Sequence, residues 1–340
     1  MAENQIPGGL DLAALSKLPL TLELCQKIMA GIQNGIYHGK PINSFEPMQP
    51  PRKVVKPNGQ YLVTEIPYGT RYMNSYLDIL YPTADTRVKR PTVIYAHGGG
   101  FFGGSKTMGD PAAAGDDKNF LFEDIVSAGF NFVNVDYVLT PEGHFPDPLY
   151  QFVEAIDFCA DHAEEYRLDM ENVVIFGSSA GAVLTMQFGA LLTDEGYRQR
   201  LGIRPKIDPR CIRCLIVDDA PNGPEKENIS LQDNWAITVM NANYYNTLDL
   251  QSDAVRGTNP YLCLNAAFPP CYFDAGPKDG FPQEMRACHD KMVSLGVETE
   301  LYIPQNPELP HGFLNLAREN DEAAEGERRV IAFMKRFTNA

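Results

Sequence analysis

Short runs of apolar residues recur along this chain, and turn signals or helical patterns separate them. Runs of this length, bounded by Gly, Pro and Asn, are typical of strands. From residue 92 onward they alternate with stretches of helical periodicity, which favours a mostly parallel sheet wrapped by helices. The predicted strands cover residues 61–66, 76–80, 92–96, 130–137, 173–176, 212–217, 271–273 and 299–303.

The helical stretches show the spacing of one buried face. A helix is predicted over residues 148–167, because Phe152, Ile156, Cys159 and Ala163 recur on one side and Asp147 can cap its start. A final helix buries a similar stripe near the end of the chain. Its members are Val330, Phe333, Met334 and Phe337.

Two regions depart from this alternation. Residues 1–60 have little strand character, and residues 18–37 are patterned as one or two amphipathic helices before a group of prolines. Residues 219–259 hold several aromatics among asparagines and follow a predicted strand, which indicates an inserted helical cap. We therefore expect a main domain over residues 61–340 that carries this insertion, with the N-terminal segment available to join the cap.

Composition narrows the functional classes. The 340 residues are 44% hydrophobic and 21% charged, and 29 basic against 44 acidic residues give a net charge of −15. The electrostatic field of so negative a protein repels phosphate backbones and anionic lipid, so neither nucleic acid nor a membrane surface is expected as a partner. No segment has the length and apolarity of a membrane span, and the first residues lack the basic start of a secretory signal. We expect a cytoplasmic protein, and a homo-oligomer is compatible with the sequence.

The cysteines give little sign of a disulfide scaffold or a metal site. There are seven, an odd number, and Cys211 and Cys214 form a C-x-x-C pair inside a predicted buried strand. Zinc sites of this spacing use a second pair, which the sequence lacks. Reduced thiols are expected, with no metal and no cofactor.

Residues 177–181 read G-S-S-A-G and carry the strongest functional signal. They match G-x-S-x-G, follow the apolar run at 173–176 and precede a helix-compatible stretch at 182–192. This strand–turn–helix order is that of a nucleophile elbow, where a sharp turn exposes the central serine hydroxyl. Ser179 is thus the candidate nucleophile, although the five-residue pattern alone also fits an ordinary tight turn.

A glycine loop lies upstream, where residues 97–101 read H-G-G-G-F after the predicted strand 92–96. Consecutive glycines let backbone N–H groups point into a site, where they can stabilise a tetrahedral oxyanion. Gly99 and Gly100 are assigned this role, with the N–H of Ala180 as a third donor. His97 is expected to shape the loop through hydrogen bonds, because the base comes last in this arrangement.

Two histidines lie well past the serine. His289 sits in a helical pattern beside Asp290 and Lys291, so a solvated helix face is expected for it. His311 lies in a breaker-rich loop, L-P-H-G-F, after the predicted strand 299–303. A loop histidine at the carboxyl end of a strand can reach a serine across the sheet edge, and His311 is therefore the predicted base.

Two aspartates compete for the acid that orients this histidine. Asp274 lies within the apolar run at 271–275, whereas Asp279 lies in the turn just past it, beside Gly280. An orienting acid belongs on the loop at the carboxyl end of a strand. Asp279 is predicted, and Asp274 is the alternative.

With these residues in order, the chain resembles the hormone-sensitive-lipase-like group of α/β-hydrolases over about residues 75–337. The resemblance implies an α/β-hydrolase fold with a small helical cap and carboxylesterase activity. Two positions depart from the family pattern: Val138 replaces an arginine, and Ser178 replaces the aspartate before the nucleophile. The matching segments are H-G-G-G-F at 97–101, D-Y-V-L-T-P-E at 136–142, G-S-S-A-G at 177–181, Gly276 with Asp279, and H-G-F at 311–313.

We therefore expect a serine carboxylic-ester hydrolase of small to medium uncharged esters that acts through an acyl-enzyme. Phe101, Ser178, Trp235 and Tyr244 are the predicted pocket residues. Three alternatives stay open: an amide or arylformamide hydrolase, a polysaccharide acetylesterase, and a non-catalytic binding homologue of the same fold. The triad residues are common to the enzymes among them, so the sequence does not separate their substrates.

Overall fold

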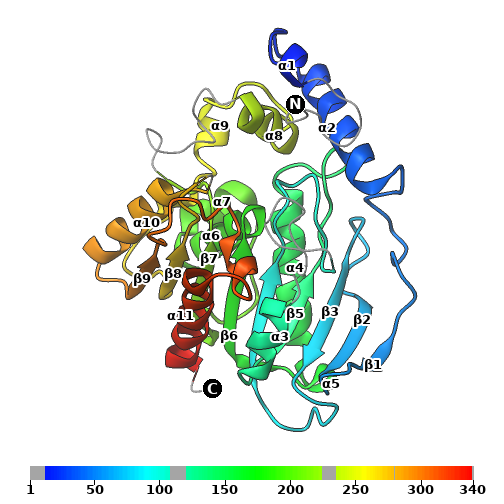
Figure 1. The fold of residues 1–340 in the computed structure, drawn as a ribbon, viewed down its shortest axis with the longest axis vertical. Helices are drawn as coiled ribbons and strands as arrows, with labels where there is room; N and C mark the ends of the chain where they lie inside the picture. The colour runs from blue at the N-terminus through cyan, green and yellow to red at the C-terminus, as the bar shows by residue number, and fades with distance from the viewer. Residues whose placement is uncertain (1–11, 108–119, 224–234, 279, 339–340) are drawn as a thin grey trace.

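The computed structural model describes residues 12–107, 120–223, 235–278 and 280–338, and its centre is one twisted sheet (Figure 1). The nine strands in these residues lie in the order β1-β2-β3-β5-β4-β6-β7-β8-β9. The first three, β1 (Lys53–Val55), β2 (Tyr61–Pro67) and β3 (Tyr76–Tyr81), pair antiparallel, and β3 also pairs antiparallel with β5. The other six strands are mutually parallel.

The eight predicted strands are all present, with ends shifted by a few residues. The parallel strands are β4 (Pro91–Ala96), β5 (Asn131–Val135), β6 (Asp169–Ser178), β7 (Ile212–Asp218), β8 (Cys271–Asp274) and β9 (Thr299–Tyr302). One strand was not expected: β1 lies in the N-terminal segment, and all three of its residues are exposed. An edge strand without a buried face has no apolar alternation by which the sequence could reveal it.

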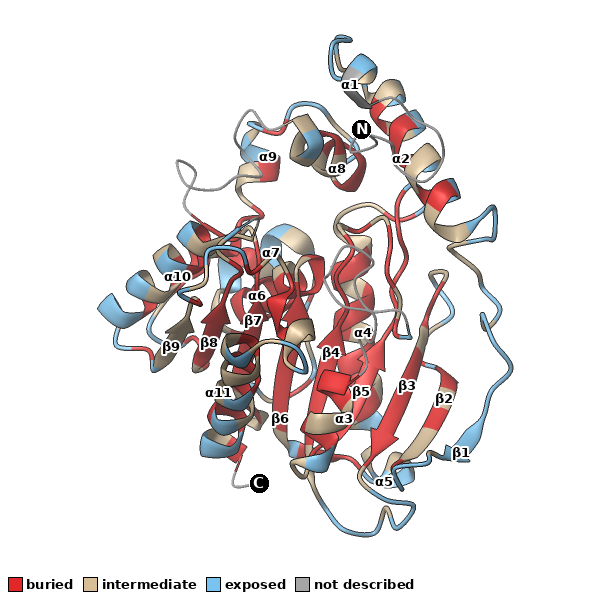
Figure 2. Cartoon of the chain, viewed as in Figure 1, coloured by how far each residue is buried: buried red, intermediate tan, exposed pale blue. Residues whose placement is uncertain are grey.

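Helices cover both faces of the sheet, and neighbouring strand residues alternate between the two cores. Val93 and Val174 pack with α3 (Phe120–Ser127) and α11 (Asp321–Thr338), whereas Ile94 and Ile175 pack with α4 (Asp147–Asp161), α6 (Ala180–Thr193) and α10 (Pro282–Ser294). The edge strand β9 is half-buried, whereas the parallel strands β4 to β8 are buried almost throughout (Figure 2). Burial on both faces explains their continuous apolar runs.

The helix predicted over 148–167 is divided in two. The first part, α4, ends at Asp161; His162, whose ψ of 19° departs from helical geometry, separates it from the short α5 (Ala163–Tyr166). The remaining short elements are α1 (Leu12–Leu15), α7 (Glu195–Leu201), α9 (Asp253–Arg256) and 3₁₀ turns at Pro209–Cys211, Pro260–Cys263 and Phe313–Leu316. Among the described residues, no helix combines the length and apolarity needed to cross a membrane.

The strand order determines where a site can form. The chain passes from β4 to β5 on one side, and then crosses to β6 on the other side of β4. At such a switch point the loops after the two strands diverge and leave a crevice at the carboxyl edge of the sheet. The glycine loop follows β4, and Ser179 follows β6.

A third hydrophobic core, separate from the two that flank the sheet, contains residues of both the N-terminal segment and the predicted cap. The helices α2 (Leu22–Tyr37) and α8 (Trp235–Tyr244) lie together, apart from the helices that flank the sheet (Figure 1). Their shared core is Cys25, Ile28, Met29, Val239 and Ala242. The start of α2 is capped by Thr21, whose hydroxyl accepts a hydrogen bond from the amide of Leu24. The domain boundaries at residues 60, 219 and 259 remain predictions.

Candidate active site

Ser179 occupies a strained turn between β6 and α6, with φ 53° and ψ −115°. Backbone angles outside the common regions cost on the order of 1–3 kcal/mol and are concentrated at functional sites. Glycine is required on both sides for steric reasons: a Cβ on Gly177 would lie 2.1 Å from the Gly181 carbonyl oxygen, and one on Gly181 would lie 1.9 Å from that of Ala96. The G-x-S-x-G pattern is therefore the requirement of this turn.

The same close approach brings the elbow to the glycine loop. A Cβ on Gly181 would also lie 2.7 Å from the carbonyl oxygen of His97. The first turn of α6 thus packs directly against the end of β4. Ser179 itself is partly exposed, whereas the residues before and after it are buried.

Ser178 turns away from the position of the nucleophile. It is buried, and its hydroxyl donates to Oδ2 of Asp218 on the neighbouring strand at 2.5 Å. Ser178 and Asp218 are register partners of β6 and β7, so the residues after them, Ser179 and Asp219, leave the sheet side by side. Both of these residues have positive φ.

His311 lies on the loop after β9, and its imidazole contacts the carboxylate of Asp219. The Nδ1 atom of His311 is 3.1 Å from Oδ2 of Asp219. The Asp219 side chain is fully buried, and its oxygens accept hydrogen bonds from the amides of Phe281 at 2.6 Å, Gly276 at 3.0 Å and Gly312 at 3.4 Å. These donors compensate for the lost hydration of the carboxylate.

Sequence reasoning missed Asp219. It is the first residue after β7, at the carboxyl edge of the sheet, so the rule that favoured a loop acid at the end of a strand applies to it equally. The two acids predicted from the sequence, Asp274 and Asp279, belong to the end of the next strand and the turn after it. Asp279 lies outside the described residues, and its candidacy stays a prediction.

Asp274 is at the end of β8, opposite Asp218 in the sheet register. Burial raises the pKa of Asp274 well above its usual value, and the adjacent Asp218 raises it further. Burial also raises the pKa of Asp218, partly offset by hydrogen bonds with Asp274 and Ser178. A neutral Asp274 removes the repulsion between two buried carboxylates at the ends of neighbouring strands.

The glycine loop adopts backbone angles that side chains disfavour. Gly99 and Gly100 have φ 111° and 59°, and a Cβ on Gly99 would lie 2.2 Å from the carbonyl oxygen of Gly103. The Gly99 carbonyl accepts hydrogen bonds from the amides of Phe102 at 3.0 Å and Gly103 at 2.9 Å. Within the described residues, the amides of Gly99 and Gly100 donate to no backbone carbonyl.

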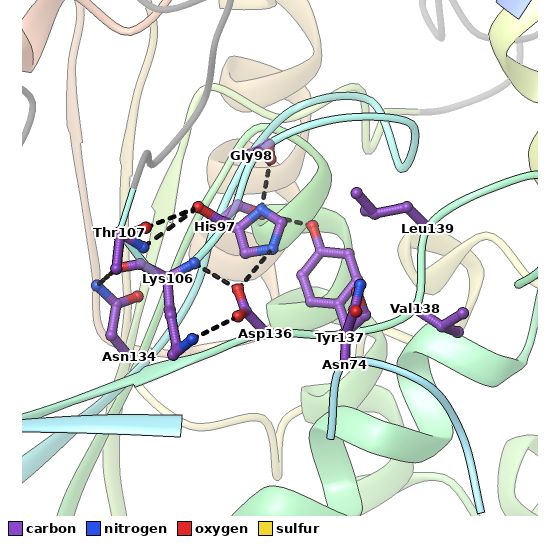
Figure 3. A network of polar contacts seen from close by, with 12 residues as sticks. Asn74, His97, Gly98, Lys106, Thr107, Asn134, Asp136, Tyr137, Val138 and Leu139 are labelled. Carbon is purple, nitrogen blue, oxygen red and sulfur yellow. Dashed lines mark hydrogen bonds and ion pairs between the residues drawn. The ribbon is translucent and has the colours of Figure 1, made fainter. Parts of the chain in front are cut away.

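One carboxylate, Asp136, contacts both ends of this loop (Figure 3). At the far end it accepts from the Lys106 amide at 2.5 Å and from the Lys106 ammonium at 2.9 Å. At the near end its Oδ1 is 3.8 Å from Nε2 of His97. The His97 ring stacks on Tyr137, whose hydroxyl donates to the His97 carbonyl at 2.6 Å. This arrangement agrees with the expected loop-shaping role of His97.

Lys106 is itself buried among acids. Its ammonium lies 2.9 Å from Glu65 and 3.9 Å from Asp78, in addition to Asp136. Burial lowers the pKa of Lys106, but the carboxylates of Asp136 and Asp78 outweigh it and hold the pKa above its usual value. Burial raises the pKa of Asp78 to about 7. Glu65 reaches inward from an irregularity in the β2–β3 register, where its φ is 58°.

Aromatic residues from the loop and the cap meet beside the glycines. The rings of Phe101 and Tyr244 stack with centroids 3.7 Å apart, and both side chains are buried. A Cβ on Gly100 would lie 3.0 Å from the sulfur of Met240 in α8. Trp235 packs instead on the α2–α8 cluster. Of the predicted pocket residues, Phe101 and Tyr244 thus lie together beside the glycine loop, Trp235 lies in the cap, and Ser178 lies beneath the elbow.

The remaining candidates from the sequence are His289 and the C-x-x-C cysteines, Cys211 and Cys214. His289 lies on α10 with Nδ1 2.9 Å from its exposed neighbour Asp290. Cys214 is buried in β7, and all seven cysteines are free thiols. The described residues contain no group of three or more His, Cys, Asp or Glu side chains placed to hold a metal ion.

Comparison with known proteins identifies the family. The sequence profile of the alpha/beta hydrolase fold family matches residues 93–315, more than half of the chain. The chain belongs to this family. The match begins within β4 and ends just past His311, so it contains the glycine loop, the elbow and the histidine loop.

Curated relatives and solved structures extend the match beyond the profile. The chain is 26% identical over 252 residues to the carboxylesterase NlhH of Mycobacterium tuberculosis, covering 74% of this chain and 75% of that protein. It is 24% identical over 266 residues to an acetyl esterase of Salmonella paratyphi A, covering 72% and 73%. The fold is similar to that of esterase B from Lactobacillus Rhamnosis, with a TM-score of 0.67 at 18% identity over 96% of both chains.

Proposed function

We propose that this chain is a serine carboxylesterase that hydrolyses esters through an acyl-enzyme. The observation that supports it most is the strained elbow, which presents Ser179 beside the glycine loop. A serine held at φ 53° is costly for the fold and has no evident structural use there. The esterase names of the relatives at 24–26% identity support the same class.

In the proposed reaction, the Ser179 oxygen attacks the ester carbonyl carbon while His311 takes the hydroxyl proton. The carbonyl oxygen becomes an oxyanion, which the amides of Gly99, Gly100 and Ala180 stabilise. The intermediate then expels the alcohol, which receives the proton from His311, and leaves an acylated serine. Water repeats the sequence: His311 takes its proton, the acid is released, and the Ser179 hydroxyl re-forms.

Two aspartates are candidates for orienting His311. The 3.1 Å contact and the three backbone donors support Asp219. The place of Asp279 in the turn after β8, predicted from the sequence, supports the other. A buried carboxylate opposite Nδ1 would hold the imidazole in the tautomer whose Nε2 accepts the serine proton, and would stabilise the imidazolium.

Small to medium uncharged acyl groups are the proposed substrates. The stacked Phe101 and Tyr244 rings and the Met240 side chain form a wall beside Gly100, which favours a bounded pocket over an open lipid groove. The net charge of −15 disfavours adsorption to anionic interfaces.

The test has two arms. A fluorophosphonate probe should label the wild-type protein, since the serine oxygen displaces fluoride from phosphorus, and should not label Ser179→Ala. The kcat/KM of acetyl, butyryl, octanoyl and palmitoyl p-nitrophenyl esters should then peak at butyryl or shorter chains. Absence of labelling would refute the serine mechanism, and a maximum at palmitoyl would refute the proposed substrate range.

A further inference from the structure

The N-terminal helix α2 contacts the glycine loop through polar side chains. Gln33 is buried, and its Nε2 donates to the carbonyl of Phe102 at 2.9 Å and to that of Thr140 at 2.6 Å. One turn further along α2, the Tyr37 hydroxyl donates to the carbonyl of Gly104 at 3.2 Å. Residues four apart share one helix face, so a single face of α2 holds this loop.

The two acceptors of Gln33 leave no ambiguity about its orientation. Both partners are backbone carbonyl oxygens, so only the NH₂ end of the amide can bond to them. The loops they belong to are also joined directly, because the Thr140 amide donates to the Phe101 carbonyl at 2.8 Å. Gln33 therefore locks the glycine loop to the loop after β5.

From Gln33, two peptide planes lead to the proposed oxyanion hole. The Phe102 carbonyl that Gln33 holds shares its planar peptide with the Gly103 amide, which donates to the Gly99 carbonyl at 2.9 Å. That carbonyl in turn shares its peptide with the Gly100 amide. In a trans peptide the N–H points opposite to the C=O, so fixing the Gly99 carbonyl fixes the direction of the Gly100 N–H.

On this basis we infer that Gln33 is a positioning residue for the oxyanion hole, and that α2 thereby couples the cap to transition-state stabilisation. Gln33 is not assigned as a donor to the oxyanion itself, because both N–H groups of its side-chain amide are engaged by loop carbonyls. The helix α2 in turn packs on α8, and the side-chain Nδ2 of Asn243 donates to the Cys25 carbonyl at 3.0 Å. The inference rests on the proposed esterase function.

The first test is Gln33→Met, which keeps the length of the side chain and removes both donors. Loss of alignment affects the charged transition state and leaves ground-state binding of a neutral ester alone. We expect kcat for p-nitrophenyl butyrate to fall by about 10- to 100-fold, somewhat less than direct removal of an oxyanion donor, with KM within about twofold. Gln26→Met makes the same change elsewhere on α2 and should leave both parameters unchanged.

A transition-state analogue separates positioning from a general structural effect. The Ser179 oxygen adds to the carbonyl of a trifluoromethyl ketone while its proton passes to His311, and the resulting hemiketal anion needs the same donors. The inhibition constant of the ketone should rise by the factor by which kcat falls in Gln33→Met, with all variants compared at equal folded fraction. An unchanged kcat, or a lower kcat with unchanged inhibitor affinity, would overturn the inference.

Gln33→Glu adds a pH readout. As a carboxylate the new side chain only accepts and repels both carbonyls, whereas as a carboxylic acid it donates one hydrogen bond. The rate of Gln33→Glu relative to the wild type at the same pH should therefore rise as the pH falls, and a flat ratio would contradict the inference. If the wild-type protein hydrolyses no ester, the proposed function is refuted. If the wild type is active and Gln33→Met has the same kcat, only the inference about Gln33 is refuted.

Discussion

The serine elbow and the glycine loop face the same site, but they are held by different interactions. The elbow is determined by backbone packing: Gly177 and Gly181 have no room for a side chain, and the adjacent strands β6 and β7 direct Ser179 and Asp219. The glycine loop is held by side chains from distant parts of the chain: Gln33 bonds to it from α2, and Asp136 binds Lys106 at its far end. Changes at the elbow should therefore affect chemistry, and changes around the loop should affect alignment and stability.

The largest effect is expected at the elbow itself. Ser179→Ala removes the nucleophile, and kcat should fall by on the order of 10⁶-fold, as in other serine triads. The fold should persist, because the turn depends on the flanking glycines. The measurement is steady-state hydrolysis of p-nitrophenyl acetate beside a thermal unfolding curve.

Ser178→Ala is the neighbouring comparison. Its hydroxyl is bonded to Asp218, so this variant should still react with a fluorophosphonate. Labelling that survives in Ser179→Ala and disappears in Ser178→Ala would exchange the roles of the two serines.

The next largest effect should identify the acid. Asp219→Asn keeps an oxygen for the backbone amides but can stabilise the wrong tautomer of His311, and kcat should fall by about 10⁴-fold, as in a comparable triad. Asp279→Asn should be measured in parallel. A loss at Asp219 with little change at Asp279 would assign the acid to the loop after β7. The opposite result would return it to the residue predicted from the sequence.

Around the glycine loop, stability should change most at Lys106. Lys106→Met leaves the buried carboxylates of Glu65 and Asp136 without their cation, and the free energy of unfolding should fall by about 3–5 kcal/mol. Lys27→Met, which removes an exposed i,i+4 pair with Glu23, should change it by less than about 0.5 kcal/mol. Urea titration of both variants measures the difference, and equal effects would show that the buried cluster has no special role.

The last expected effect is a pH dependence of stability at the same cluster. Because the folded pKa of Asp78 is raised to about 7, the folded state holds a proton that the unfolded chain releases near pH 4. This contribution to stability is full below about pH 4 and is lost as the pH rises to about 7, with a slope of up to about 1.4 kcal/mol per pH unit.

Asp78→Asn removes that titration while keeping an acceptor for the Glu65 amide. Unfolding free energies between pH 5 and 8 should decline less steeply in the variant than in the wild type. Parallel curves would show that Asp78 is ionised throughout this range.

The same contrast explains what the sequence could predict. Strands, elbow, glycine loop and histidine loop were predicted because each is a local pattern of apolar periodicity or turn residues. Asp219 was not, because a single aspartate after a strand has no local signature; its role depends on amides from two other loops. Gln33 and Lys106 were missed for a similar reason, since the partners of Gln33 lie 69 and 107 residues away in the chain, and the partners Glu65 and Asp136 of Lys106 lie 41 and 30 residues away.

The attachment of α2 to the glycine loop has a consequence for protein engineering. A designer who divides the molecule at the prolines before β1 would keep every residue of the proposed triad and all three glycines. The shortened enzyme would nonetheless lack Gln33 and Tyr37, which hold the loop from outside. Chimeras that exchange the N-terminal helix between relatives would therefore change turnover as well as substrate choice, because the exchanged part reaches the reacting atoms through the backbone.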